Sequence, residues 1–399
     1  MESQPVTQVR GPAVVVIAYD RTDSLARLLE SLSRAHYPAD VEVPLVISVD
    51  YAPHADTAGL AERFDWPHGE KRIIAHRQNL GLRAHVLSCG DLALDYGCVA
   101  IFEDDLVAAP YFYDWVRRAS DFYADEPRVG GIGLYSYKLN EFNNLNFVPL
   151  SDGSDVHFLQ VAASWGQAWT ADQWRAFRAW YDAHKSEPIS QADGVPEQLE
   201  AWKESSWKKY YIKYLAVTDR FFVYPNVALS TNTAKPGTHT KRPVNLYQVP
   251  LDMGPRSWSL RRLDDSSALY DAFYELRPEA LRRLCPWLEG IAFDIDLMGL
   301  KPSAALKSPH LISTRDCNRP QRQWALEMIP IEANIAFGVN GDFVSLGPRE
   351  AFAPMSESRR LAVIRHLNLF AYWNKYFFQL FKPIQTKLQI ARQSLKRKA

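Results

Sequence analysis

The sequence predicts an α/β protein with a mostly parallel, doubly wound sheet, and two observations support this prediction. In the first part of the chain, short apolar or β-branched runs alternate with amphipathic helical patterns, which is typical of parallel strands joined by crossover helices. One apolar run, 98–102, passes directly into Glu103, Asp104 and Asp105. Ligands of such sheets bind beyond the carboxyl ends of the strands, so these three acids stand where a functional site is expected.

Strand and helix patterns follow one another from the start of the chain. The β-branched run at 14–17 leads into Thr22-Asp23, which we interpret as the cap of a helix with leucines at helical spacing. The run at 43–49 ends at Asp50. The predicted elements of this part are strands at 14–17, 43–49, 73–75 and 98–102, and helices from 22, over 83–96 and from 110.

Beyond residue 128 the patterns are less regular, and we divide the chain at about residue 245, where short proline-containing segments begin. The predicted domains are 1–244, an accessory region at 245–347 and a basic amphipathic tail at 348–399. The predicted elements are strands at 129–135, 220–224, 312–314, 332–337 and 343–346, helices after Thr170 and over 197–214 and 268–276, and polar loops at 140–155 and 231–240.

The composition is that of an ordinary globular protein, with 47% hydrophobic and 23% charged residues. Lys+Arg and Asp+Glu both number 46, so no overall charge favours nucleic acid as a partner. Ten of the basic residues and none of the acidic ones lie at 358–399. The body of the chain is therefore acidic and its tail basic.

Several patterns bear on where the protein works. Its four cysteines show no CxxC pair or other metal-ligand spacing, which fits a reducing compartment. Neither a secretory leader nor an apolar run of about 20 residues is visible. We therefore expect a cytoplasmic protein.

Three consecutive carboxylates at a strand end suit a hard divalent cation. Mg²⁺ or Mn²⁺ is commonly held by one or two carboxylates together with the phosphates of a substrate. The alternative is a solvated acidic turn, and the three acids taken alone are weak evidence. Their place after a buried strand favours a binding site.

Five segments occur in the order in which a known family has them: VVVIAYDR, VISVDYA, NLGLRAH, VAIFEDDLVAAPYFYDW and SWGQAWTADQW. Together they resemble the GT-A glycosyltransferases, and among these the N-acetylglucosaminyltransferase I group and its bacterial relatives. The resemblance covers roughly residues 12–240. It implies a GT-A, Rossmann-like catalytic domain over that part of the chain.

The resemblance implies a nucleotide site. Arg21, preceded by Ala18 and Tyr19, matches an arginine near the nucleotide; Asp50 matches an acid that contacts the uracil; His85 matches a histidine near the nucleotide. Each residue also has a structural alternative. Arg21 suits a surface charge at a helix start, Asp50 a turn former, and His85 a buried, hydrogen-bonded histidine.

The resemblance also implies roles at the phosphates. Glu103 and Asp104 match acids that serve the sugar and the ribose, and Asp105 matches the acid that binds the metal directly. The segment TAKPGTHT resembles a loop in bacterial members, so that Lys235 and His239 are expected to help clamp the diphosphate. A solvated loop is the alternative for these two residues.

One expected acid is missing from its usual place. Serines at 205 and 206 stand where the family has a carboxylate just before a Trp, which acts as base on the acceptor hydroxyl. We therefore predict that Glu204 is the base, with Asp155 and Asp193 in reserve. The alternative for Glu204 is a solvated helix residue without a catalytic role. The absence also keeps open a catalytically inactive protein of the same fold that binds nucleotide sugars or carbohydrate.

These patterns predict an inverting, metal-dependent glycosyltransferase. It would move a sugar from a nucleotide sugar, most simply a UDP-sugar, to a hydroxyl of a saccharide or lipid-linked acceptor in surface polysaccharide or glycan synthesis, with Mn²⁺ or Mg²⁺ as cofactor. A nucleotidyltransferase is disfavoured, since its Gly- and Lys-rich phosphate loop is absent after the first strand. The basic, aromatic tail suggests peripheral contact with the inner face of a membrane; a helix packed on the body is the alternative.

Overall fold

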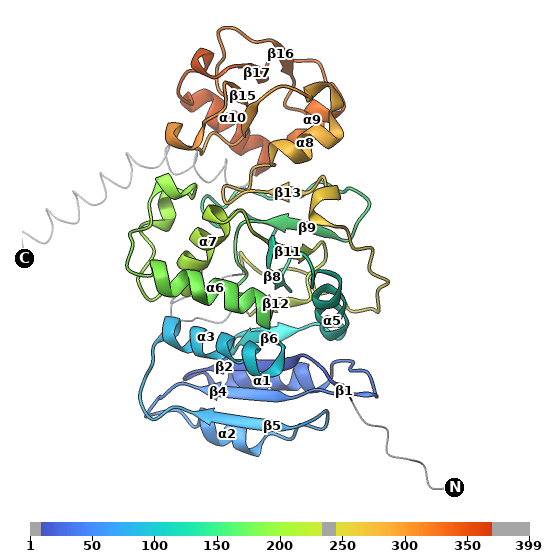
Figure 1. The fold of residues 1–399 in the computed structure, drawn as a ribbon, viewed down its shortest axis with the longest axis vertical. Helices are drawn as coiled ribbons and strands as arrows, with labels where there is room; N and C mark the ends of the chain where they lie inside the picture. Colours follow the sequence, from blue (N-terminus) through green and yellow to red (C-terminus); the bar gives the residue numbers. More distant parts are fainter. Residues whose placement is uncertain (1–8, 234–244, 369–399) are drawn as a thin grey trace, which may run out of the picture. The chain divides into compact units, whose positions relative to one another are not determined.

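The computed structural model describes residues 9–233 and 245–368, and the chain forms two compact units (Figure 1). The first contains residues up to Lys138 together with Pro149–Arg283 and Pro302–Ala305, and the second contains Leu139–Val148, Leu284–Lys301 and the chain from Leu306 onward. The boundary thus differs from the predicted one at residue 245. Residues 245–283 belong to the first unit because they supply an additional strand to its sheet.

The first unit is built on a nine-stranded sheet with the order β13-β9-β11-β8-β10-β6-β2-β4-β5. The pairs of neighbours β5 and β4, β4 and β2, β2 and β6, β8 and β11, and β9 and β13 are parallel, so the α/β, mostly parallel fold class is confirmed. The strands are β2 (Ala13–Ala18), β4 (Leu45–Val49), β5 (Lys71–Ala75), β6 (Cys98–Glu103), β8 (Val129–Gly133), β9 (Val156–Leu159), β10 (Gln167–Thr170), β11 (Phe221–Pro225) and β13 (Leu269–Tyr270).

The strands predicted at 14–17, 43–49, 73–75, 98–102, 129–135 and 220–224 are present as β2, β4, β5, β6, β8 and β11. Strand β10 lies between β6 and β8 and is antiparallel to both, and β9 is antiparallel to β11. Neither β9 nor β10 was predicted. Each is only four residues long, which is too short for a periodic pattern to stand out.

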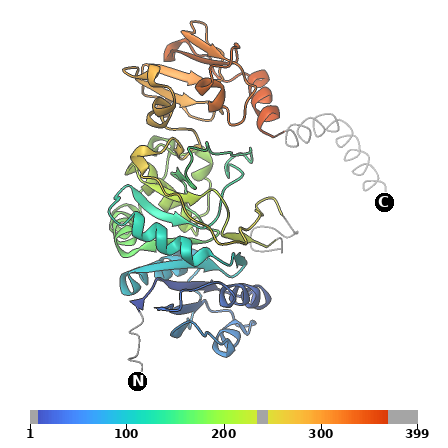
Figure 2. The same ribbon diagram turned by 90° about the vertical axis from the view of Figure 1, so that its right-hand side faces the viewer.

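Helices of the first unit cover the sheet, and their bounds are α1 (Thr22–Ser33), α2 (Thr57–Arg63), α3 (Leu82–Asp91), α4 (Ala93–Tyr96), α5 (Phe112–Phe122), α6 (Ala171–His184) and α7 (Trp207–Val217). Helices α3, α6 and α7 lie together: α7 contacts both α3 and α6. Helix α5 is at the front in Figure 2 and contacts β8 and β10. Two short pairs flank the large sheet, β1 (Val9–Arg10) with β3 (Val41–Glu42) and β7 (Leu106–Ala108) with β12 (Ser230–Asn232).

Aromatic side chains form the core beneath α6 and α7. Trp169 of β10 packs against Trp174 of α6 and stacks on Tyr211 of α7, with ring centroids 4.8 Å and 5.6 Å away. All three side chains are almost fully buried. Burying residues of this size contributes several kcal/mol each, so the core fixes α7 against β10.

Two predicted helices of the first unit differ in the structure. The helix expected over 197–214 begins only at Trp207, because the hydroxyl of Ser206 accepts a hydrogen bond from the backbone of Lys209 and caps the helix there. The helix expected over 268–276 is instead strand β13 followed by a turn. Its Leu269 pairs with Phe158 of β9, so sheet pairing outweighs the local pattern.

The second unit contains a four-stranded sheet with the order β14-β15-β17-β16. Its elements are β14 (Phe293–Asp296), β15 (His310–Ser313), β16 (Arg322–Trp324), β17 (Val344–Pro348), α9 (Glu332–Ala336) and α10 (Glu357–Leu367), and α8 (Pro278–Leu284) ends where the unit begins. The segment 332–337, predicted as a strand, is helix α9. Among the helices of residues 9–233 and 245–368, none has the length and apolarity to cross a membrane. The tail beyond residue 368 lies outside the described residues.

Candidate active site

The carboxyl ends of β2 and β6 bring Arg21 against two of the three predicted acids. The strands are parallel neighbours, with Ile17 opposite Glu103, so the residues that follow them share one edge of the sheet. The Arg21 guanidinium lies 2.6 Å from Asp104 Oδ1 and 2.7 Å from Asp105 Oδ2. Arg21 therefore joins two carboxylates that are more than 80 residues away in the chain.

Burial sets the protonation of these acids. It raises the pKa of Asp104 to about 6, although the Arg21 cation opposes the rise. Burial, although incomplete, is also the main reason why the pKa of Glu103 is raised, and the neighbouring charges of Asp105 and Asp104 raise it further. The pKa of Arg21 is itself raised by these acids against the effect of its own burial. The site thus holds three acids close together at the cost of perturbing two of them.

Tyr19 and Ala18 complete the turn after β2. The backbone N–H of Tyr19 donates to Asp104 Oδ2 over 3.2 Å, and the carbonyl of Ala18 accepts from the N–H of Asp50. The Tyr19 side chain is 41% exposed. These two residues therefore position Asp104 and Asp50 through their backbone, and the ring of Tyr19 remains open to a ligand.

Asp50 is buried after β4 and organises the following loop. Its Oδ1 accepts from the N–H groups of Tyr51 and Leu80, at 2.9 Å and 2.8 Å, and its Oδ2 accepts from the N–H of Gly81 at 3.1 Å. Gly81 has a φ of +75°, which favours glycine at the start of α3. Asp50 thus holds the NLG segment at the sheet edge, which is the role expected of a turn-forming residue.

His85 lies in the first turn of α3 and is 3% exposed. Its Nε2 lies 2.8 Å from Ser48 Oγ, which also lies 3.1 Å from His76 Nε2. Desolvation lowers the pKa of His85 to about 4. His85 is therefore a neutral hydrogen-bonding group below the loop that Asp50 holds.

Each of the three predicted bases is held by contacts of its own. Glu204 precedes α7, and its carboxylate accepts from Lys209 Nζ at 2.6 Å and Tyr210 Oη at 2.5 Å; these bonds lower its pKa. The carboxylate is also 3.6 Å from Arg83, at the start of α3. With 73% of its side chain exposed, Glu204 remains accessible to an acceptor.

Asp155 and Asp193 are held by other contacts. Asp155 precedes β9, where it accepts from the N–H of Ser259 at 2.8 Å and pairs with Arg256 at 3.3 Å. Asp193 caps a single turn by accepting from the N–H of Ser190, and it lies 3.4 Å from Lys213. Both carboxylates therefore hold local structure and are more buried than Glu204, with 26% and 19% of their side chains exposed.

Lys235 and His239 lie outside the described residues. The last residue before that segment is Thr233, whose N–H donates to the carbonyl of Asp105 over 3.0 Å.

Lys208 is an additional charged residue near the acids and is not among the predicted site residues. It lowers the pKa of Glu103, and its own side chain is buried in the first turn of α7. The sequence could have indicated that Lys208 is buried, because it has helical spacing with Ile212 and Leu215, which are both fully buried. This spacing places Lys208 on the buried face of α7.

The described residues fit a metal that is shared with a substrate. Within 9–233 and 245–368, no three His, Cys, Asp or Glu side chains are grouped so as to hold an ion. Asp105 offers a carboxylate that is 32% exposed and uses one oxygen on Arg21. One carboxylate plus substrate phosphates is a usual way to bind Mg²⁺ or Mn²⁺, so Asp105 would hold the ion once a diphosphate is present.

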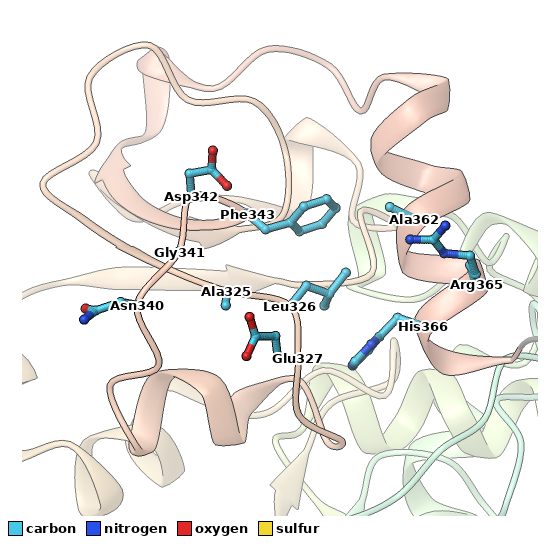
Figure 3. A pocket seen from close by; sticks show the side chains of 10 residues that line it. All are labelled: Ala325, Leu326, Glu327, Asn340, Gly341, Asp342, Phe343, Ala362, Arg365 and His366. Carbon is cyan, nitrogen blue, oxygen red and sulfur yellow. The ribbon is translucent and has the colours of Figure 1, made fainter.

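A separate pocket of about 320 Å³ lies in the second unit (Figure 3). It lies between α10 and the loop before β17, and its charged and aromatic lining residues include Glu327, Asp342, Phe343, Arg365 and His366. It contains none of the predicted site residues. The acid cluster of the first unit is therefore the candidate active site.

Comparisons with known proteins leave the family open. Neither a protein-family model nor a curated protein matches the sequence. Among solved structures, the chain is similar to S. aureus TarS 1-349, with 14% identity over 56% of this chain and 61% of that one and a TM-score of 0.36. TarS in complex with UDP-GlcNAc gives 15% identity over 57% and 60% and a TM-score of 0.36.

The mannosyltransferase PcManGT from Pyrobaculum calidifontis, in complex with GDP-Man and Mn²⁺, gives 14% identity over 42% of this chain and 47% of that one, with a TM-score of 0.28. The chain spans about three-fifths of the TarS 1-349 chain and about half of PcManGT. Scores and identities this low do not establish a family.

Proposed function

We propose that the protein is an inverting glycosyltransferase that moves a sugar from a nucleotide sugar, a UDP-sugar in the simplest case, to a hydroxyl of a saccharide or lipid-linked acceptor. The observation that carries the proposal is the cluster of Arg21, Asp104 and Asp105 at the carboxyl edge of a parallel sheet. Ligands of such sheets bind at this edge. The resemblance of the sequence segments to GT-A enzymes gives the cluster its chemical meaning.

Each residue has a physical task in this proposal. Asp50, by holding the N–H groups of Leu80 and Gly81, shapes the wall for the nucleotide base. Arg21 would contact the diphosphate and exchange part of its contact with Asp105 for phosphate oxygens. Asp105 would hold Mn²⁺ or Mg²⁺, which stabilises the charge of the departing diphosphate.

Inversion requires one in-line displacement. The acceptor oxygen forms its bond to the anomeric carbon as the bond from that carbon to the diphosphate oxygen breaks, and a base takes the acceptor proton. We assign this proton to Glu204, which is exposed, ionised and located at the same end of α7 as Lys208. Its bonds to Lys209 and Tyr210 would have to loosen when the acceptor binds.

A screen with nucleotide sugars tests the proposal without knowledge of the acceptor. Isothermal titration of the full chain with UDP, UDP-glucose, UDP-galactose, UDP-N-acetylglucosamine and GDP-mannose, with and without Mn²⁺, should reveal binding that depends on the ion, followed by slow donor hydrolysis. Binding without hydrolysis or transfer would support the alternative, an inactive nucleotide-sugar-binding protein. No binding in any combination would refute both.

We also propose that the basic tail brings the protein to the inner, anionic face of a membrane, where a lipid-linked acceptor would lie. Because Val363 and Leu367 of α10 are buried, the tail is best removed after Asn368, which leaves that helix whole. The shortened protein should not sediment with vesicles containing phosphatidylserine, whereas the full chain should. Equal sedimentation of both proteins would refute the membrane contact.

A further inference from the structure

Strand register places Gln167 of β10 on the same face of the sheet as Glu103 of β6. Gln167 lies opposite Ile101 and Ala168 lies opposite Ala100 in the antiparallel pair of β10 and β6. Because alternate residues share a face of a sheet, Glu103 and Gln167 lie on one face, the same face on which Trp169 packs against α6 and α7. Trp165 precedes β10, on the other side of Gly166, whose φ is +92°.

Lys208, in the first turn of α7, extends its side chain toward this group of residues. Its side chain is 6% exposed, its Nζ donates to Tyr137 Oη at 2.9 Å, and the Nζ lies 5.4 Å from the ring centroid of Trp165. The rings of Tyr137 and Trp202 also lie within 6 Å of it. Burying an ammonium group is costly unless other groups compensate, and the aromatic faces and the nearby Glu103 do so here.

Gln167 adds a polar group that the fold itself does not use. The side chain is 1% exposed, and among the residues that the structure describes neither its Nε2 nor its Oε1 has a hydrogen-bond partner. A buried amide without a partner costs a few kcal/mol, so such groups call for an explanation. A ligand that supplies both a donor and an acceptor, as a sugar hydroxyl does, would satisfy it.

We propose that Glu103, Trp165, Gln167 and Lys208 form the subsite that receives the glycosyl group of the donor. The inference rests on the proposed function and deepens it. A neutral pyranose fits this set, since its hydroxyls donate to the carboxylate and accept from the ammonium, while its apolar face packs against an indole. The glycosyl group is bonded directly to the diphosphate, and Glu103 directly precedes Asp104 and Asp105.

The position of Lys208 is fixed before any ligand arrives. Tyr137, which follows β8, and Trp165, which precedes β10, hold the ammonium from two sides. A group held in this way needs little further ordering to bind a hydroxyl. The subsite would therefore select the donor sugar by its hydroxyl pattern, whereas Asp50 and Arg21 would contact the base and the diphosphate, which all UDP-sugars share.

Lys208→Met, with Lys213→Met as its matched control, tests the subsite. Both lysines are buried on α7, but Lys213 Nζ donates to the Pro188 carbonyl at 2.9 Å and pairs with Glu187 and Asp193, away from Glu103. The probes are UDP and the nucleotide sugar of the panel that wild type hydrolyses fastest. Lys208→Met should keep the UDP affinity within twofold and lower kcat/KM for donor hydrolysis by about tenfold or more, the loss of one charged hydrogen bond.

Lys213→Met should lower Tm while leaving hydrolysis at the wild-type value. Unchanged hydrolysis in Lys208→Met would overturn the inference, and so would an equal loss of affinity for UDP and for the nucleotide sugar, which would assign Lys208 to the diphosphate or to the fold. If wild type binds no nucleotide sugar at all, the proposed function fails and the subsite with it.

Gln167→Leu provides a second test that does not depend on how Lys208→Met folds. Removing an unsatisfied buried amide should leave Tm unchanged or raised, yet hydrolysis of the nucleotide sugar should fall severalfold while UDP binding is kept. A purely structural role predicts that Tm and hydrolysis change together. Wild-type hydrolysis in Gln167→Leu would remove Gln167 from the subsite and contradict the proposal.

Discussion

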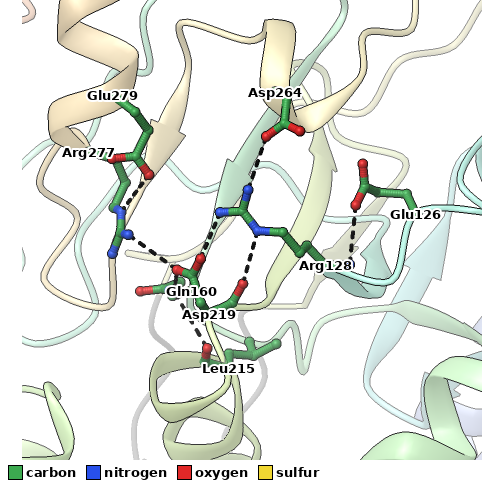
Figure 4. A network of polar contacts seen from close by, with 8 residues as sticks. All are labelled: Glu126, Arg128, Gln160, Leu215, Asp219, Asp264, Arg277 and Glu279. Carbon is green, nitrogen blue, oxygen red and sulfur yellow. Dashed lines mark hydrogen bonds and ion pairs between the residues drawn. The ribbon is translucent and has the colours of Figure 1, made fainter.

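Charged side chains surround arginines at both edges of the large sheet, the one formed by the carboxyl ends of its parallel strands and the one formed by their amino ends. The pKa values of the acids at the two edges are shifted in opposite directions. At the carboxyl ends of β2 and β6, Arg21 bridges Asp104 and Asp105. At the opposite edge, where β8 and β11 begin, Arg128 and Arg277 both bind Asp219, at 2.8 Å and 3.2 Å (Figure 4).

The network at the opposite edge also includes Asp264, 3.0 Å from Arg128, and Glu279, 3.1 Å from Arg277. Burial alone would raise the pKa of Glu279, but the Arg277 cation lowers it below its ordinary value. For Glu103 and Asp104, burial and neighbouring acids prevail and the pKa is raised. The difference is one of arrangement, since three of the acids in the active-site cluster are consecutive in the chain and repel one another.

We expect this difference between an edge that stabilises the fold and one that, as we propose, binds a ligand. At the opposite edge, the two guanidinium groups of Arg128 and Arg277 pair with Asp219, Asp264 and Glu279, whereas at the carboxyl edge the guanidinium of Arg21 alone pairs with Asp104 and Asp105. At the carboxyl edge, the excess of closely spaced acids is costly without a ligand, and perturbed pKa values of this kind gather at functional sites. A divalent ion and a sugar would relieve the repulsion.

The largest expected effect is that of Asp105→Ala. Loss of the proposed metal ligand should abolish Mn²⁺-dependent UDP binding, measured by isothermal titration, while the free energy of unfolding changes by no more than about 1 kcal/mol, since a partly exposed turn residue leaves no cavity. Asp264→Ala, at the opposite edge, should keep UDP binding. Wild-type activity that persists unchanged in EDTA would show that Asp105 holds no metal.

Glu204→Gln is expected to have the next largest effect. If this residue takes the acceptor proton, turnover should fall by roughly 10² to 10⁴, the usual contribution of a positioned base, with nucleotide-sugar binding retained. Asp155→Asn and Asp193→Asn, measured in parallel, should retain turnover. A normal rate for Glu204→Gln would transfer the role to one of them, and normal rates for all three variants would place the acceptor elsewhere.

Arg128→Met should affect stability rather than binding. Asp219 would keep Arg277 but lose its shorter ion pair, at a cost of about 2 kcal/mol, because the pair is only partly exposed. Arg262→Met removes a more exposed pair with Asp125 and should leave the free energy of unfolding close to the wild-type value. Urea unfolding measures both values; a loss of UDP binding in Arg128→Met would contradict the separation of the two edges.

The smallest expected effect is on how stability depends on pH. When the free energy of unfolding is measured in EDTA without nucleotide, Glu103 at one edge and Glu279 at the other should make it change with pH in opposite directions. The pKa of Glu103 is raised on folding, so above the ordinary value of 4.5 the unfolded carboxyl ionises first and the folded state loses stability as pH rises. The free energy of unfolding of Glu103→Gln, relative to that of wild type, should therefore increase as pH rises from 5 to 8.

The pKa of Glu279 is lowered on folding, so its contribution is present above pH 4.5 and is lost as pH falls through the folded value. Glu279→Gln should be less stable than wild type at pH 7, by about 0.5–1 kcal/mol for a partly exposed pair, and the deficit should shrink below pH 4.5. Parallel pH profiles for the two variants would contradict the contrast between the edges.

The sequence by itself determined the parallel half of the fold and the place of the acids. Strands β2, β4, β5 and β6 are apolar runs long enough to be recognised, and ligand sites lie at the carboxyl ends of such strands. The strands depend on local pattern, which one sequence contains. Arg21 and Asp50 were predicted as site residues only through the resemblance of the sequence segments to GT-A enzymes, and their roles in binding stay predictions.

Only the tertiary structure decided which distant groups meet. The insertion of β10 between β6 and β8 brings Gln167 to the face of the sheet that carries Glu103, and β13 extends the first unit to about residue 283. The pairing of Arg21 with Asp104 and Asp105, and the burial of Lys208 among aromatic rings, follow from these neighbours. Strands of two to four residues are specified by their partners rather than by their own sequence, and a charge buried by such pairing shows no local sign of its partners.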